Sequence, residues 1–236
     1  MQLIYEGKAK KVHTADAPNE VIIHFKDEAT AFNGEKKDIF DGKGLINLAF
    51  SKYFFKLLSE NNVNTHFISG INNTSFKATK VKIIQLEVVV RNFAAGSICK
   101  RENYEKGHKF DSPLVEFFLK DDSKGDPLIS KQEIISNNIA TAHEIDILEQ
   151  EALNINAILF KHLDLKDIIL VDFKLEFGKD NNNKILLADE ISPDTCRFWA
   201  KGTMNSLDKD VYRENKGNLV DSYKTIANII GVNYEI

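Results

Sequence analysis

The sequence predicts an α+β fold built as two lobes, and three observations predict it. Residues 3–26 and 65–98 are mostly of β type, helical periodicity prevails later in the chain, and the regular strand–helix–strand alternation of a wound parallel sheet is missing. We expect a boundary near residues 82–86. It separates an N-terminal lobe of residues 1–84, mainly antiparallel sheet with one helix, from an α+β C-terminal lobe of residues 85–236.

The N-terminal elements follow from turn residues and periodicity. Residues 4–11 and 21–25 read as strands separated by a turn-rich stretch that contains Pro18 and Asn19. From Gly44 the apolar residues recur at helical spacing, which predicts an amphipathic helix that ends at an Asn pair. Residues 86–90 are apolar enough to form a buried strand.

The C-terminal elements have clearer boundaries. Residues 120–127 have the polarity of a loop, and capping-box patterns at 130–133 and 141–144 predict two helix starts. The second of these helices should bury one apolar stripe, formed by Ile145, Leu148, Ala152, Ile155, Leu159 and Leu163. Residues 168–191 resemble a hairpin, and a last helix should end at Gly231.

The composition excludes several functional classes. Apolar residues make up 43% and charged residues 28% of the 236, an ordinary globular balance. A formal charge of −4 disfavours nucleic acid as a partner. Cys99 and Cys196 form no CxxC pair, and no signal peptide or membrane span is evident, so we expect a cytoplasmic protein.

Residues 170–178, LVDFKLEFG, form the sharpest local pattern. Asp172, Lys174 and Glu176 alternate with apolar residues, so a strand would place all three charged groups on one face, about 6–7 Å apart from one to the next. That spacing suits a row of ligand contacts. The alternative is a solvated sheet face, which gives the same alternation.

A second charged segment, residues 186–194, ends an apolar run with three carboxylates. Oxygen ligands from two neighbouring strands are what Mg²⁺ needs when it is bound mainly through nucleotide phosphates, and we select Glu176 and Asp189 as the metal pair. Arg197 could offer a planar fork to a phosphate or a carboxylate.

Two weaker patterns complete the set. In residues 87–97, Glu87 and Arg91 share a strand face, and the small residues before Ser97 permit close approach of a phosphate. The alternative is a structural turn that binds no ligand, which is common after a strand. In GKAK, Lys8 and Lys10 could cover a triphosphate, or could simply guard an edge strand. No P-loop or dinucleotide fingerprint is present.

Four motifs in this order resemble the SAICAR synthetase (phosphoribosylaminoimidazole-succinocarboxamide synthase) family: GKAK at 7–10, EVVVRNFAAGS at 87–97, LVDFKLEFG at 170–178 and DEISPDTCR at 189–197. Gln85 departs from the family pattern, which usually has proline two residues before the glutamate of the second motif. Because Gln restores an N–H and frees φ, we expect a looser connector with unchanged chemistry.

The resemblance implies a fold related to protein kinases and ATP-grasp enzymes, with the nucleotide between the lobes. It also implies an ATP- and Mg²⁺-dependent ligase of purine biosynthesis that joins carboxyaminoimidazole ribotide to L-aspartate through an acyl phosphate. The partners are then small molecules, with no nucleic acid or membrane, and the chain is expected to form a homodimer.

The resemblance further implies roles for individual residues. Lys8, Lys10, Lys120 and Glu176 would bind ATP, with Glu176 and Asp189 holding Mg²⁺. The ribotide would contact Glu87, Arg91, Ser97, Asp194, Arg197 and Arg213. Lys174 and Asp172 would lie nearest the transferred group, in roles that the sequence does not separate. Two alternatives stay open: a related kinase or ligase with another small acceptor, and a non-catalytic nucleotide sensor.

Overall fold

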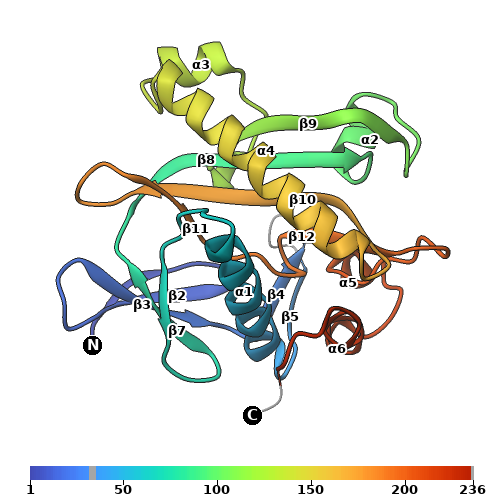
Figure 1. The fold of residues 1–236 in the computed structure, drawn as a ribbon, viewed down its shortest axis with the longest axis horizontal. Helices are drawn as coiled ribbons and strands as arrows, with labels where there is room; N and C mark the ends of the chain where they lie inside the picture. The colour runs from blue at the N-terminus through green and yellow to red at the C-terminus, as the bar shows by residue number, and fades with distance from the viewer. Residues whose placement is uncertain (32–35, 235–236) are drawn as a thin grey trace.

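The computed structural model describes residues 1–31 and 36–234 (Figure 1). An antiparallel five-stranded sheet, here called the N-terminal sheet, has the order β1-β2-β3-β7-β6. Its strands are β1 (Leu3–Glu6), β2 (Lys10–Thr14), β3 (Glu20–Phe25), β6 (Phe67–Gly70) and β7 (Ser75–Thr79). In β3, burial alternates residue by residue, so one face of this sheet packs against the core.

A long helix connects the strands of the N-terminal sheet. The two-stranded ribbon of β4 (Glu28–Ala31) and β5 (Lys36–Ile39) precedes α1 (Lys43–Glu60). Phe50, Phe54 and Phe55 on α1 are almost fully buried, and α1 packs against β3, β6 and the last helix of the chain. Helix α1 is therefore a central core element, as Figure 1 shows.

A second antiparallel sheet, here called the C-terminal sheet, has the order β11-β10-β8-β9, with β12 pairing on β10. Its strands are β8 (Lys82–Phe93), β9 (Lys109–Leu119), β10 (Ile168–Lys179), β11 (Ile185–Ala188) and β12 (Cys196–Ala200). Helix α4 (Ala142–Asp164) crosses one face of β8 and β10 (Figure 1). The opposite face is left for the functional site.

Shorter helices complete the fold. They are α2 (Ser97–Arg101), the 3₁₀ turn η2 (Asp122–Lys124), α3 (Lys131–Ser136), α5 (Asp210–Arg213) and α6 (Leu219–Ile230). Among the residues that the structure describes, no helix is both long and apolar enough to cross a membrane.

Most of the expected elements are found. The fold is α+β, both capping boxes are formed, and all six stripe residues of α4 are buried. The hairpin at 168–191 is β10–β11, and α6 ends at Gly231 in a left-handed conformation. The 82–86 boundary stays a prediction: it falls where the chain leaves the N-terminal sheet and enters β8.

The expectation of a single strand over residues 4–11 is wrong. The Gly7 N–H donates to the Lys10 carbonyl at 2.8 Å, which closes a tight turn and separates β1 from β2. Lys8 therefore lies in a turn, and only Lys10 lies in a strand.

Candidate active site

A cleft of about 560 Å³ is lined by residues of both sheets. Apolar side chains from β2 and β3 and from the segment that enters β8 form part of its wall: Val12, Val21, Ile23, Val81 and Ile83. Lysines and carboxylates form another part. Such a lining suits a ligand with a flat apolar ring and a charged tail.

Two charged residues of β10, Lys174 and Glu176, line this cleft. Lys174 Nζ lies 2.5 Å from Glu87 Oε1 and 3.5 Å from Glu176 Oε1, and Lys120 Nζ lies 2.5 Å from Glu176 Oε1. Asp172 pairs in register with Arg91, and Glu176 with Glu87. Two separate predictions are therefore confirmed: Asp172, Lys174 and Glu176 share one strand face, and so do Glu87 and Arg91. The pairing of β8 with β10 places both sets on the same side of the sheet.

Burial and pairing shift the protonation of these residues. Burial would lower the pKa of Lys174, but the carboxylates of Glu176 and Glu87 outweigh it and raise that pKa well above its usual value. Burial raises the pKa of Glu87, and its pairing with Lys174 opposes the rise only in part. Lys174 is thus a fixed positive charge beside the cleft.

Asp189 lies at the end of β11 in an unusual backbone conformation. Its φ is +60°, a left-handed value that non-glycine residues seldom adopt. Lys10 pairs with Asp189 and reaches Glu190 Oε1 at 2.6 Å, while His66 Nε2 lies 3.2 Å from the Asp189 carbonyl oxygen. Burial would raise the pKa of Asp189, but Lys10 and Lys174 outweigh it and lower it to about 2. The exposed Lys8 lines the cleft nearby.

The donor chemistry fits a Mg²⁺ ion that arrives with a nucleotide. Among residues 1–31 and 36–234, no three His, Cys, Asp or Glu side chains gather into a protein-only metal site. Glu176 and Asp189 nevertheless both present carboxylates to the cleft. Mg²⁺ is commonly held by one or two carboxylates together with substrate phosphates and water, so two carboxylates suffice.

A chain of buried ion pairs lies beyond Asp172. Arg91 Nη1 donates to Asp172 at 2.6 Å, and Arg197 Nη1 donates to the same carboxylate at 2.9 Å. Arg197 Nε and Arg213 Nη1 each donate to Asp210 at 2.7 Å. The Asp172 carboxylate therefore binds two guanidinium groups, those of Arg91 and Arg197.

Gly96 and Ser97 lie at the edge of this arginine cluster. Gly96 has φ +64°, and a Cβ built on it meets Arg197 Nη2 at 2.6 Å. Ser97 Oγ accepts from Arg91 Nη2 at 3.5 Å. Only glycine lets the guanidinium lie this close to the backbone.

Asp194 is held in a second buried network. Lys43 Nζ, from the start of α1, lies 2.5 Å from Asp194 Oδ2, and the Tyr223 hydroxyl of α6 donates to Oδ1 at 2.5 Å. Lys209 Nζ lies farther away, 3.9 Å from Oδ2. Burial would raise the pKa of Asp194, but Lys209 and Lys43 outweigh it and hold it well below its usual range.

The sequence prediction missed six residues of this site. Glu190 stood within a recognised motif but was not selected, and the stretch of residues 41–44 at the start of α1 gave no sign that Lys43 would be buried. The missed residues are Lys43, His66, Glu190, Lys209, Asp210 and Tyr223. Most of them are isolated in sequence and become neighbours only through the fold.

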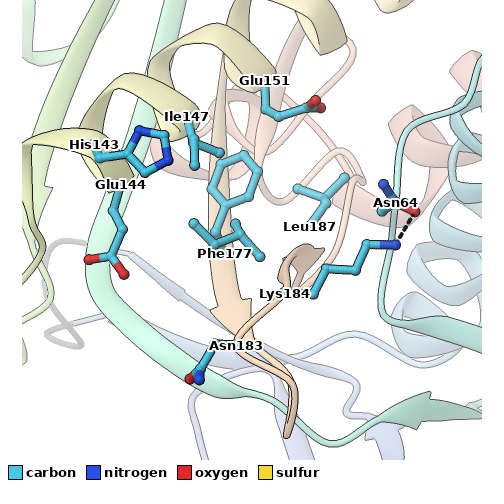
Figure 2. A pocket seen from close by; sticks show the side chains of 10 residues that line it. Asn64, His143, Glu144, Ile147, Glu151, Phe177, Asn183, Lys184 and Leu187 are labelled. Carbon is cyan, nitrogen blue, oxygen red and sulfur yellow. Dashed lines mark hydrogen bonds between the residues drawn. The ribbon is translucent and has the colours of Figure 1, made fainter.

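Another cavity, of about 430 Å³, lies on the α4 side of β10 and β11 (Figure 2). Figure 2 shows Phe177 between Ile147 and Leu187, with the Lys184 ammonium bonded to Asn64 at 2.8 Å. None of the predicted site residues lines this cavity. The cleft between the sheets is instead lined by eight of them: Lys8, Lys10, Glu87, Lys120, Lys174, Glu176, Asp189 and Asp194. Arg91, Ser97, Asp172, Arg197 and Arg213 are not part of its lining.

These features define a class of protein. Lysines that can bind a polyphosphate, two carboxylates that can hold its metal ion, and a neighbouring arginine cluster for a second anion belong to an enzyme that uses a nucleotide to act on an anionic substrate.

Comparison with known proteins gives the family. The SAICAR synthetase family model matches residues 3–230. The chain is 52% identical to the phosphoribosylaminoimidazole-succinocarboxamide synthase of Coprothermobacter proteolyticus, with 98% of each chain covered. It is 50% identical to the synthase of the same name from Staphylococcus aureus, with 97% of each covered.

Solved structures agree with the sequence relatives. The crystal structure of the Ehrlichia chaffeensis synthase has a TM-score of 0.96 and 44% identity, covering 98% of this chain and 99% of that one. A SAICAR synthetase in complex with ADP has a TM-score of 0.93 and 49% identity, covering 96% of each chain. The chain belongs to the SAICAR synthetase family, and its activity class is that of an ATP-dependent carbon–nitrogen ligase.

Proposed function

We propose that this chain condenses carboxyaminoimidazole ribotide with L-aspartate, using ATP, to give SAICAR, ADP and phosphate in purine biosynthesis. The observation that carries the proposal is the cleft in which Lys10, Lys120 and Lys174 meet the carboxylates of Glu176 and Asp189. A relative that is 49% identical forms a complex with ADP, which supports a nucleotide as the ligand of this chain.

The reaction requires activation of a carboxylate, because an amine cannot expel oxide from it at neutral pH. A carboxylate oxygen of the imidazole attacks the γ-phosphorus of ATP, and the β–γ bridging bond breaks to release ADP. The aspartate amine then attacks the acyl carbon of the mixed anhydride, loses a proton, and expels inorganic phosphate. Both steps build negative charge on phosphoryl oxygens, so positioning and charge neutralisation are the protein's main contributions.

The nucleotide site uses charges that already neutralise one another. We assign Lys8, Lys10 and Lys120 to the phosphates of ATP, and Glu176 and Asp189 to Mg²⁺, which would neutralise phosphate charge when bound. Binding then exchanges partners: the ammonium groups turn from carboxylates to phosphate oxygens, and the carboxylates turn to the metal ion. Because the side chains are held in place before binding, little reorganisation is needed.

The ribotide site lies at the arginine cluster. We assign the ribotide phosphate to Ser97 and to the Arg197 guanidinium group beside Gly96. Arg91, which donates to Ser97 Oγ, would hold that hydroxyl in place. Glu87 and Asp194 would orient the ring or its hydroxyl groups, as both line the cleft.

Lys174 and Asp172 have different surroundings, and these favour different roles. Lys174 lines the cleft, so it can neutralise the transferring phosphoryl group. Asp172 is buried between Arg91 and Arg197, so we assign it to orienting these guanidinium groups. A proton acceptor for the aspartate amine then has to be sought among the other carboxylates of the cleft.

The resemblance to the family also supports four further properties. We propose that the enzyme acts in the cytoplasm as a homodimer, that Mg²⁺ is required for turnover, and that residues 1–84 and 85–236 act as two lobes around the nucleotide.

The test is phosphate release by the purified protein with ATP, Mg²⁺ and the imidazole carboxylate. We expect release only when L-aspartate is added, with one SAICAR formed per phosphate. Loss of turnover in Asp189→Ala, with the fold retained, should accompany this result. Steady turnover without aspartate would identify a kinase-like enzyme with another acceptor and overturn the proposal.

A further inference from the structure

Asp189 and Glu190 direct their carboxylates to one ammonium group although they are neighbours in sequence. Lys10 Nζ pairs with Asp189 and lies 2.6 Å from Glu190 Oε1. In a continuing strand, consecutive side chains point to opposite faces of the sheet, so the chain has to turn after β11 for both to reach Lys10. The left-handed conformation of Asp189, with φ +60°, supplies this turn. The direction of the Asp189 carboxylate therefore depends on a backbone conformation that needs support from its surroundings.

His66 supplies that support through the carbonyl group of Asp189. His66 Nε2 lies 3.2 Å from the Asp189 carbonyl oxygen. Because a carbonyl oxygen can only accept, the imidazole must carry a proton on Nε2 to make this hydrogen bond. The direction of the carbonyl group is set by the ψ angle of Asp189, so the hydrogen bond fixes the turn at the residue that we assign to the metal ion.

The imidazole of His66 is itself held in place. It is 3% exposed, and it meets the rings of Phe55 and Phe76 edge to face, with centroids 5.5 Å and 5.4 Å from its own. The His66 N–H donates to the Leu187 carbonyl at 2.8 Å, and the Thr79 N–H donates to the His66 carbonyl at 2.7 Å. His66 therefore bridges the N-terminal sheet and β11, and its ring has a fixed orientation.

We propose that His66 is a positioning residue for the metal site, because it holds the Asp189 carboxylate in the direction from which that carboxylate can bind the Mg²⁺ ion of the nucleotide. The inference deepens the proposed function, since it rests on the assignment of Asp189 to Mg²⁺. The Nε2 nitrogen is occupied by the Asp189 carbonyl, so His66 acts through the main chain and not as a metal ligand. Groups that orient metal ligands commonly control metal affinity.

The experiment measures ADP binding by calorimetry at a series of free Mg²⁺ concentrations. It compares the wild type with His66→Leu and His66→Phe, which remove the donor and differ in size, and with His66→Gln, whose side-chain amide can replace the donor. His24→Leu is the matched control. His24 is a partly buried histidine of β3 that bonds to Ser75, and it points away from the sheet face on which Ile23 lines the cleft.

In both variants without the donor, the Mg²⁺ concentration that gives half of the full effect on ADP binding should rise roughly 10- to 100-fold. The affinity for ADP without Mg²⁺ should stay close to the wild-type value, because the lysines assigned to the phosphates are unchanged. His66→Gln should recover most of the loss, and His24→Leu should behave as the wild type.

A merely structural role of His66 would weaken ADP binding equally with and without Mg²⁺. That outcome would overturn the inference, as would an unchanged Mg²⁺ dependence in both variants without the donor, or a loss in His66→Gln as large as in His66→Leu. If one of these two variants does not fold, the other gives the same comparison, and failure of both to fold would assign His66 a structural role and overturn the inference. Phosphate release by the wild type without aspartate would instead overturn the proposed function, and it would not change this titration.

Discussion

Removing one partner of the buried ion pair between Lys43 and Asp194 should strongly destabilise the fold. Lys43 is fully buried, the Asp194 side chain is 4% exposed, and their charged atoms lie 2.5 Å apart. Removing one partner of such a pair costs about 3–5 kcal/mol because the other charge stays buried. Asp194 would keep the Tyr223 hydroxyl and the more distant Lys209, so we expect Lys43→Met to lose about 3 kcal/mol, at the lower end of that range.

Urea unfolding can measure this loss, because Trp199 is the single tryptophan and is 2% exposed, so its fluorescence should report unfolding. Lys56→Met is the matched control, since Lys56 lies on the same helix with 79% of its side chain exposed. We expect the control to change by less than about 0.5 kcal/mol. The double variant Lys43→Met/Asp194→Asn should lose less than the sum of its single variants. A Lys43→Met loss within about 1 kcal/mol of zero, or strict additivity, refutes the reasoning.

Three other outcomes are expected. Lys174→Met should lower kcat by roughly 10²–10³-fold while the midpoint of thermal unfolding changes little, as measured by phosphate release and calorimetry. Gly96→Ala should raise the KM for the ribotide by pushing the Arg197 guanidinium aside, whereas Gly202→Ala, which also has a positive φ but meets nothing within 4 Å, should leave that KM unchanged. Burial lowers the pKa of His66 from 6.5 to about 4, so the unfolded chain takes up the proton first and stability falls as the pH drops below 6.5. Between pH 7.5 and pH 5 this amounts to about 2 kcal/mol, and His66→Gln should remove that part of the pH dependence in urea titrations.

Local patterns predicted the parts of the fold that depend on neighbours in sequence. Alternation with a period of two placed Asp172, Lys174 and Glu176 on one face because a strand turns its side chains by half a turn per residue. The capping boxes predicted α3 and α4 because the side chains that satisfy the first amides lie within four residues of one another.

The sequence prediction failed for elements and contacts that depend on distant parts of the chain. Strand β9 contains Pro113, and its first half is mostly exposed, so no regular alternation of apolar residues marks it in the sequence. It lies at the edge of the C-terminal sheet, where proline is tolerated. Lys43 and Tyr223 are separated from Asp194 by long stretches of chain and follow no common period. Their convergence depends on how α1 and α6 pack, which no local pattern records.

The central claim is that the cleft brings the γ-phosphate of ATP to a carboxylate that it activates. The most direct measurement uses ribotide whose imidazole carboxylate carries ¹⁸O in both oxygens, with wild-type enzyme, ATP, Mg²⁺ and aspartate. If the carboxylate attacks the γ-phosphorus, each inorganic phosphate released should contain one ¹⁸O atom by mass spectrometry, and SAICAR should keep the other. Phosphate that carries only oxygen from ATP and water would contradict the account.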